Sequence, residues 1–211
     1  RPEAVRVVGS MKFDDGAVAL RAQVDAEKLI AQAGAPKKPL IIVGGSTHTG
    51  EDAILARAYK ALKPKFPELF LVDVPRHQER GRAAAAEIEK EGLTLKFRSN
   101  ITGNTSAEPG SGDCQLVNTT GELKAFYEIA DIVFVGKSLS AKSGGQNPIE
   151  PAGLGKPILF GPSMENFPDI APQFVEKGGA FQVPDEAHLI ARLGELLSDP
   201  KKRETMGSAA K

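Results

Sequence analysis

Short runs of apolar residues alternate along the chain with longer segments in which apolar and polar residues mix. Residues 40–43 and 132–135 are continuous apolar runs, which is typical of strands buried on both faces of a sheet. Residues 51–62 instead place Ile54, Ala58 and Leu62 at helical spacing. Strands and helices that alternate in this way indicate βαβ units. They predict an α/β protein with a Rossmann-like, doubly wound parallel sheet.

The same alternation extends over the whole chain. The expected strands are residues 4–8, 40–43, 69–74, 93–97, 116–117, 132–135, 156–160 and 180–183. The expected helices are residues 15–33, 51–62, 78–90, 120–130, 147–154, 167–177, 186–197 and 201–209. We expect residues 1–14 to be a linker and a first strand, and residues 15–211 to form one Rossmann-like domain. Ligands of such sheets bind at the carboxyl ends of the strands, so the loops that follow the strands are the candidate sites.

Composition narrows the classes of function. The 211 residues include 27 Lys and Arg and 27 Asp and Glu, so the net charge is zero and no nucleic-acid partner is expected. The sequence has one cysteine and no HExxH, CxxC or Asp-x-Asp pattern. We therefore expect neither a metal site nor a disulfide. Apolar runs of about four residues are far shorter than the roughly 20 that span a membrane, so we expect no spanning helix and no signal peptide. Because the first residue is Arg1, we expect a piece of a longer protein.

A loop with the sequence GGSTHTGE, residues 44–51, follows the expected strand at 40–43. Its small residues let the backbone approach a ligand closely, and the helix that follows offers free N–H groups. It matches neither the Walker pattern nor GxGxxG. Two interpretations stay open: a turn that faces an anionic ligand or a substrate, or a tight turn that Ser46 or Thr49 caps.

Two further loops carry candidate ligands. Arg76 follows the third expected strand, and a guanidinium at its carboxyl end can bind a phosphate or a base carbonyl. The alternative is a solvent-facing arginine paired with Glu79. Later in the chain, Thr120 is expected to cap a helix and Gly121 to leave its first N–H groups free for a phosphate. The alternative there is a cap without a ligand.

Residues 144–151, with the sequence GGQNPIEP, are the most informative segment. Asn147 is expected to cap a helix whose first residue is Pro148. Glu150 then stands three residues after the cap, where it can close a capping box. The alternative is that the Glu150 carboxylate accepts both hydroxyls of a ribose, as acidic residues do in nucleotide sites.

Six segments, in order along nearly the whole chain, resemble one family: the Kdo (3-deoxy-D-manno-octulosonic acid) transferases of lipopolysaccharide synthesis. The matching segments are GSMKFD at 9–14, GSTHTGE at 45–51, VPRH at 74–77, GEL at 121–123, GGQNPIEP at 144–151 and GPSMENF at 161–167. Each is weak alone, but their order and spacing are specific. The resemblance implies the GT-B arrangement, in which two Rossmann-like domains face a cleft. This chain is similar to the C-terminal half, which binds the sugar nucleotide CMP-Kdo.

The resemblance also implies the residues of the site. The expected CMP contacts are Pro75, Arg76, Gly121, Glu122, Leu123, Asn147, Pro148, Ile149 and Glu150. The residues expected near the sugar or in the cleft are Ser46, Thr47, His48, Gly144, Gly145 and Gln146. Helix N-termini at 121–123 and at Asn147 are expected to face the phosphate. Glu150 is expected to hold the ribose, and Arg76 to neutralise the phosphate or to contact the cytosine.

For the intact enzyme the resemblance implies transfer of Kdo from CMP-Kdo to a lipid A precursor, at the cytoplasmic face of the bacterial inner membrane and without a cofactor. The general base is expected in the absent N-terminal half, so this chain has no expected catalytic residue. We expect it to bind CMP, to be soluble without membrane contact, and to be inactive alone.

Some residues depart from the family pattern, and rival functions stay open. Gln146, Gln78, Thr49 and Lys137 stand where the family commonly has His, Pro, Glu and Gly. The first rival is a GT-B transferase or epimerase that uses another nucleotide sugar. The second is a non-catalytic Rossmann-like binding module.

Overall fold

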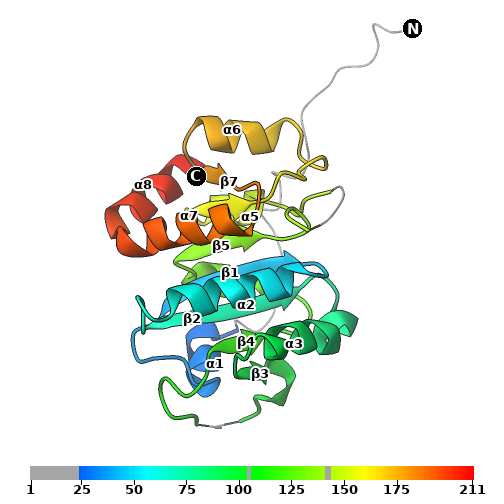
Figure 1. Cartoon of the computed structure of the whole chain (residues 1–211), viewed down its shortest axis with the longest axis vertical. Coiled ribbons are helices and arrows are strands. Elements are labelled where there is room, and N and C mark those ends of the chain that lie inside the picture. Colours follow the sequence, from blue (N-terminus) through cyan, green and yellow to red (C-terminus); the bar gives the residue numbers. More distant parts are fainter. Residues whose placement is uncertain (1–23, 104–105, 141–143) are drawn as a thin grey trace, which may run out of the picture.

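The computed structural model describes residues 24–103, 106–140 and 144–211, and a seven-stranded sheet forms its centre (Figure 1). The strands are β1 (Leu40–Thr47), β2 (Leu69–Pro75), β3 (Leu95–Phe97), β4 (Cys114–Leu116), β5 (Ile132–Val135), β6 (Ile158–Phe160) and β7 (Ala180–Gln182). Their order is β3-β4-β2-β1-β5-β6-β7, and each neighbouring pair is parallel. The strands β2, β3 and β4 therefore lie on one side of β1, with β4 inserted between β2 and β3, and β5, β6 and β7 follow in order on the other side. This confirms the doubly wound, Rossmann-like α/β prediction.

Helices cover both faces of the sheet. They are α1 (Ala26–Gln32), α2 (Glu51–Leu62), α3 (Gly81–Lys90), α4 (Leu123–Ile129), α5 (Ile149–Gly153), α6 (Ile170–Glu176), α7 (Glu186–Ser198) and α8 (Pro200–Ala210). Short 3-10 turns, η3 (Gln78–Arg80) and η4 (Arg98–Asn100), precede α3 and follow β3. Within the described ranges, no helix combines the length and apolar character that crossing a membrane requires.

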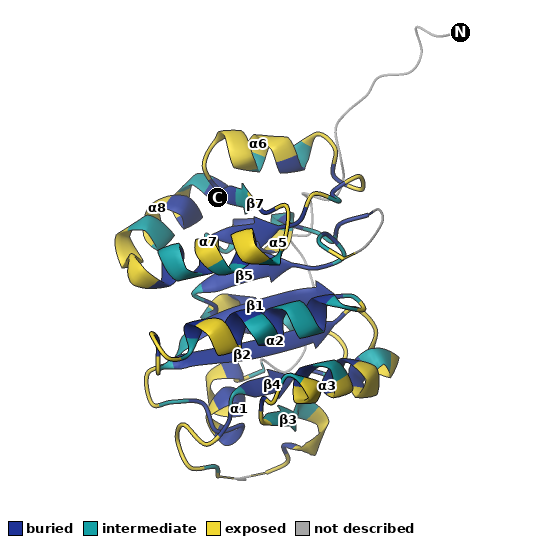
Figure 2. Cartoon of the chain, in the orientation of Figure 1, coloured by how far each residue is buried: buried dark blue, intermediate teal, exposed yellow. Residues whose placement is uncertain are grey.

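Two apolar cores lie on the two faces of the sheet. Side chains of α2, α3 and α7 pack with Ile42 and Phe134 in one core, and side chains of α1, α4, α5 and α6 pack with Val43 and Val133 in the other. The alternation follows from the period of two along a strand, which sends successive side chains to opposite faces. Figure 2 shows the consequence: the central strands are buried along their length, while the exposed residues gather on the outer faces of the helices.

Most element boundaries fall close to their predicted positions. The helix at 51–62 and the strand at 132–135 are confirmed to the residue. The helix expected at 15–33 starts later, at Ala26, because the Asp25 side chain caps it by accepting the Lys28 N–H at 2.9 Å. Residues 1–23, which include the expected linker and first strand, lie outside the described residues.

Candidate functional site

The loops that follow the parallel strands meet along the carboxyl edge of the sheet, as the topology requires. The Thr47 carbonyl accepts the Arg76 N–H at 3.1 Å, which joins the loops after β1 and β2. The Thr120 hydroxyl lies 3.2 Å from the side-chain oxygen of Gln78, which joins the loops after β4 and β2. Segments that are up to about 70 residues apart in the sequence are thus adjacent in space.

Glu51 links the loops of this edge. Its carboxylate is fully buried and forms no ion pair with another described residue. One carboxylate oxygen accepts the backbone N–H groups of His48 at 2.8 Å and Lys137 at 2.7 Å. The other accepts those of Ser138 at 2.8 Å and Leu139 at 2.9 Å. Four N–H donors satisfy the buried charge, and they tie the loop after β5 to the turn before α2.

In the sequence, Glu51 is only the last residue of the GSTHTGE motif, and no contact was predicted for it. A glutamate directly after a glycine-rich turn is the available signal, but its partners come from a loop more than 80 residues away. The expected caps of this turn are wrong: α2 begins after Gly50, which stands in the left-handed region, and neither Ser46 nor Thr49 supplies a side-chain cap.

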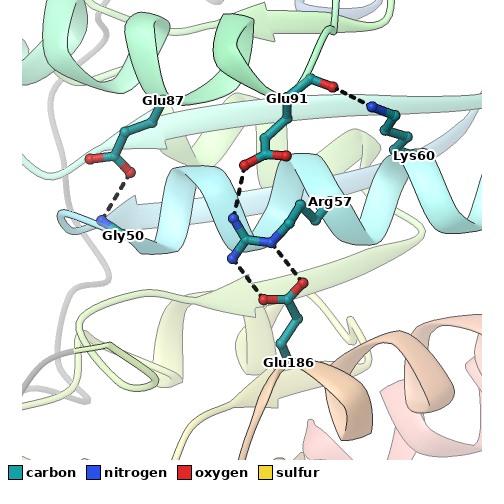
Figure 3. Close-up of polar contacts among 6 residues, drawn as sticks. All are labelled: Gly50, Arg57, Lys60, Glu87, Glu91 and Glu186. Carbon is teal, nitrogen blue, oxygen red and sulfur yellow. Dashed lines mark hydrogen bonds and ion pairs between the residues drawn. The ribbon is translucent and has the colours of Figure 1, made fainter.

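A second polar network supports the same turn from the helical side (Figure 3). The Gly50 N–H donates to the Glu87 carboxylate of α3 at 2.9 Å. Further along α2, the Arg57 guanidinium binds Glu186 of α7 through two nitrogens at 2.7 and 2.8 Å, and Glu91 at 2.9 Å. The Gly50 bond therefore holds the start of α2 against α3, and the Arg57 bonds hold its middle against α3 and α7.

Backbone strain is concentrated where the loops after β1 and β5 touch. Ser46 and Lys137 are the non-glycine residues of the described chain with positive φ, at 55° and 56°. A side chain at Gly136 would collide with the Ser46 carbonyl, so the two loops are in backbone contact. Left-handed conformations of non-glycine residues are costly and cluster at functional sites.

Buried carboxyl groups lie on the other side of β1. Asp52 and Asp73 are both fully buried, and the Arg80 guanidinium binds Asp52 at 2.5 Å and the Thr47 carbonyl at 2.8 Å. Burial raises the pKa of Asp73 well above its usual value, and the neighbouring Asp52 carboxyl raises that pKa further. Asp73 therefore keeps its proton to a higher pH than an exposed aspartate does. Nothing in the sequence motifs pointed to this group.

His48 lies between these two anchors of the turn. Burial lowers the pKa of His48, Glu51 opposes the change, and the positive charges of Arg80, Lys137 and His77 lower it further. The imidazole is therefore neutral at pH 7. Its Nε2 atom is buried and has no hydrogen-bond partner among the described residues.

The Arg76 side chain is exposed beside this turn. The predicted alternative, a pair with Glu79, is absent from the ion pairs of the described residues. A guanidinium without a carboxylate partner is available to an anionic ligand. Pro75, the preceding residue, is the last residue of β2 and is buried.

The segment after β4 differs from its prediction. Thr120 does not cap a helix, because α4 starts three residues later, at Leu123. The Glu122 carboxylate binds the Arg98 guanidinium at 2.9 Å and the Thr119 hydroxyl, so both of its oxygens are engaged. Gly121 has a φ of 81°, which only glycine adopts without strain. Backbone groups, rather than the Glu122 carboxylate, are what this segment offers a ligand.

In the segment after β5, Asn147 and Glu150 form hydrogen bonds at the start of α5 that differ from the predicted ones. The Asn147 side-chain oxygen accepts the Ile149 N–H at 3.0 Å, but the N-cap of α5 is Pro148, one residue after the expected Asn147. Pro148 precedes α5 instead of opening it. Glu150 is exposed, and its carboxylate accepts the Asn147 side-chain amide at 3.1 Å instead of the backbone N–H of a capping box. The other Glu150 oxygen has no partner among the described residues and can accept a hydroxyl.

The loop after β6 holds the two glycines of this segment. The Gly144 N–H donates to the Glu165 carboxylate at 2.7 Å, and the Asn166 amide donates to the Gly145 carbonyl at 3.1 Å. A side chain on Gly145 would lie 2.5 Å from the Met164 sulfur, so glycine is required there. Glu165 and Asn166 are supporting residues that the sequence analysis placed in a motif without a role.

A cavity of about 550 Å³ opens at the opposite, amino-terminal edge of the sheet, where Lys37, Asp131 and Lys156 contribute to its lining. The predicted site residues do not line it. Among residues 24–103, 106–140 and 144–211, no cluster of three or more His, Cys, Asp or Glu side chains is arranged to hold a metal ion.

Comparisons with known proteins show that the chain is similar in sequence to glycosyltransferases. Residues 110–211 match the family model "Glycosyl transferases group 1". The chain is 38% identical over 213 residues to the 3-deoxy-D-manno-octulosonic acid transferase of Bordetella pertussis, and 35% identical over 210 residues to that of Haemophilus influenzae. The chain is related in sequence to the Kdo transferases. The matches cover 98–99% of this chain and 47% of each relative, so the chain spans about half the length of the curated relatives it matches.

A solved structure supports the same relationship. The C-terminal CMP-Kdo binding domain of WaaA from Acinetobacter baumannii superimposes with a TM-score of 0.75 at 26% identity. The match covers 82% of this chain and 88% of that domain. The Rossmann-like fold is thereby confirmed for this chain, which is similar in structure to that C-terminal domain.

Proposed function

We propose that this chain binds CMP and CMP-Kdo at the carboxyl edge of its sheet, as the donor-binding half of a Kdo transferase. The observation that carries the proposal is the convergence of the segments after β1, β2, β4 and β5 on that one edge. The relationship to the Kdo transferases supports the identity of the nucleotide sugar.

The phosphate of the ligand is assigned to cationic and N–H groups. Backbone N–H groups at residues 121–123 lie at the start of α4, and the Asn147 N–H lies just before α5, where they favour an anion. Pro148 has no N–H, and the Ile149 N–H is bound to the Asn147 side chain. The exposed guanidinium of Arg76 supplies the positive charge. Together they stabilise the phosphate as negative charge develops on the leaving CMP.

The ribose and the sugar take the remaining predicted residues. The free oxygen of the Glu150 carboxylate accepts ribose hydroxyls, and Asn147 fixes that carboxylate through its amide. The sugar lies toward the residues of the two touching loops, namely Ser46, Thr47, His48, Gly144, Gly145 and Gln146. The hydrogen bonds that the Glu51 carboxylate accepts from both loops hold this part of the site together.

For the intact protein we propose transfer of Kdo to a lipid A precursor at the cytoplasmic face of the inner membrane. An acceptor hydroxyl, deprotonated by a carboxylate of the other half, attacks the anomeric carbon. The bond between that carbon and the phosphate oxygen breaks with inversion, and CMP leaves. Because this chain holds only the donor side, we expect it to bind CMP without transferring Kdo. Kdo transfer by the isolated chain would contradict this division of roles.

Calorimetric titration of the chain with CMP, cytidine and UDP tests the donor site. We expect CMP to bind more tightly than UDP, and Arg76→Ala and Glu150→Gln each to weaken CMP binding about tenfold or more, as the loss of a charge-assisted hydrogen bond does. Arg82→Ala on α3 and Glu204→Gln on α8 are matched controls, since both side chains are exposed and lie outside the predicted site.

The outcomes of that titration separate the candidates. Tighter binding of UDP than of CMP would favour a transferase or epimerase for another nucleotide sugar. No affinity for any nucleotide would favour the non-catalytic module. Equal losses in the site variants and the controls would show that the site is misplaced.

A further inference from the structure

The backbone of Lys137 is fixed on both sides in an unfavourable conformation. Its φ of 56° lies in the left-handed region. Its N–H donates to the Glu51 carboxylate at 2.7 Å, and its carbonyl accepts the Gly145 N–H at 2.8 Å. A glycine would adopt this conformation without strain, so the backbone alone gives no reason for a lysine here.

The side chain of Lys137 extends along the glycine pair of the next segment. A Cβ atom placed on Gly144 would lie 2.7 Å from the Lys137 Cε and 3.0 Å from its Nζ. The residue is half-buried. No described carboxylate forms an ion pair with its ammonium group. The ammonium is therefore placed at the contact of the two loops without a counter-charge.

The carboxylates around this ammonium are already engaged. Glu51 accepts four backbone N–H groups and cannot also pair with the lysine without losing one of them. Glu165 accepts the Gly144 N–H at 2.7 Å, and Asp52 is bound by Arg80. A half-buried ammonium without a carboxylate partner favours an anionic ligand.

We infer that Lys137 is an anion-binding residue of the donor site, where its ammonium contacts a negatively charged oxygen group of the bound nucleotide sugar. This inference rests on the proposed function. Two groups of the donor share the required chemistry, the phosphate and the carboxylate of the octulosonic acid. The strained backbone positions the ammonium beside His48, and Glu51 holds that backbone in place.

Calorimetry on the whole chain with cytidine, CMP and CMP-Kdo tests the inference. The variants are Lys137→Met, which removes the charge, Lys137→Gly, which also removes the strain, and Lys137→Arg, which keeps the charge. Lys90→Met, at an exposed position on α3, is the control. We expect Met and Gly at position 137 to weaken the anionic ligand about tenfold or more, Arg to restore most of the affinity, and cytidine binding to stay unchanged.

The pattern of losses identifies the anion and can overturn the inference. Equal loss for CMP and CMP-Kdo assigns the phosphate, and a loss for CMP-Kdo alone assigns the sugar carboxylate. If the wild type binds both ligands and the Met and Gly variants bind them equally well, the inference fails while the proposed function stands. If the wild type binds no cytidine nucleotide, both fail.

Discussion

The turn between β1 and α2 is held from two sides by carboxyl groups that work in opposite ways. On the β5 side, the buried Glu51 carboxylate accepts four backbone N–H groups. On the β2 side, Asp73 is equally buried without such donors, and burial, together with the neighbouring Asp52, raises its pKa. Arg80 joins that side to the turn by binding both Asp52 and the Thr47 carbonyl.

The two buried acids therefore support the same turn by different means. A carboxylate that accepts several N–H groups fixes the positions of loops, because each bond has a direction. A buried acid with a raised pKa instead makes a contribution to stability that changes with pH. We therefore expect the β5 side to control the geometry of the site, and the β2 side to control how stability changes with pH.

The largest effect is expected for Glu51→Ala. The change leaves the four N–H groups at the loop contact without their acceptor, and we expect the free energy of unfolding to fall by about 4 kcal/mol. Glu51→Gln keeps two acceptor sites and should lose less. Urea denaturation measures both, with Glu27→Ala, an exposed first-turn glutamate of α1, as the control. A loss for Glu51→Ala no larger than that of the control would contradict the role of Glu51.

A smaller but substantial effect is expected for Arg80→Met, which breaks the link on the β2 side. Asp52 stays buried without its cation, so we expect a loss of about 3 kcal/mol in the free energy of unfolding at pH 7. Unchanged stability at pH 7 would show that this ion pair does not hold the turn.

The next effect is a change in pH dependence in Asp73→Asn. A group with a raised pKa contributes stability that is fully present below its usual value of 3.8 and is lost as the pH rises toward the raised pKa. We therefore expect the wild type to lose about 1 kcal/mol or more relative to Asp73→Asn between pH 4 and pH 8.

Asp113→Asn is a control of opposite sign. Burial favours the neutral form of Asp113, but hydrogen bonds from the Thr94 backbone and hydroxyl outweigh it, so the pKa is lowered. The wild type should therefore gain stability relative to Asp113→Asn as the pH rises through that lowered value. Parallel pH curves for the wild type and Asp73→Asn would mean that Asp73 is ionised in the fold.

The smallest effect is expected for Lys137→Gly on stability. A left-handed lysine costs about 1–2 kcal/mol, and glycine gives back about 0.5–1 kcal/mol through its freedom in the unfolded chain. The net expectation is a gain of about 0.5 kcal/mol, measured by thermal unfolding beside Ser46→Gly, whose residue has the same conformation. A clear loss of stability would show that packing of the Lys137 side chain stabilises the fold by more than its left-handed backbone costs.

Sequence patterns predicted the strands and helices of the molecule better than the contacts within its site. Residues 51–62 and 132–135 match because apolar periodicity directly reflects burial against a sheet. The cap at Thr120 was wrong because Gly121 and the bonds of Glu122 to Arg98 and Thr119 delay the start of α4. That arrangement depends on a residue from another loop, which no local pattern contains.

The supporting residues of the site were missed for the same reason. Glu51, Arg80 and Asp73 act through partners in distant loops, and their motifs say only that a turn is present. By contrast, the hydrogen bond from the Ile149 N–H to the Asn147 side chain is local, because its acceptor and donor lie two residues apart. Long-range polar contacts are therefore the part of this site that required the structure.

The most direct test of the account is a crystal structure of the chain with CMP. We predict that the nucleotide lies at the carboxyl edge of the sheet, with its phosphate at the backbone of residues 121–123 or of Asn147 and its ribose hydroxyls on Glu150. Arg76 should lie within reach of the phosphate or the base. CMP bound only in the cavity of about 550 Å³ at the opposite edge, or an empty carboxyl edge at saturating CMP, would contradict the account.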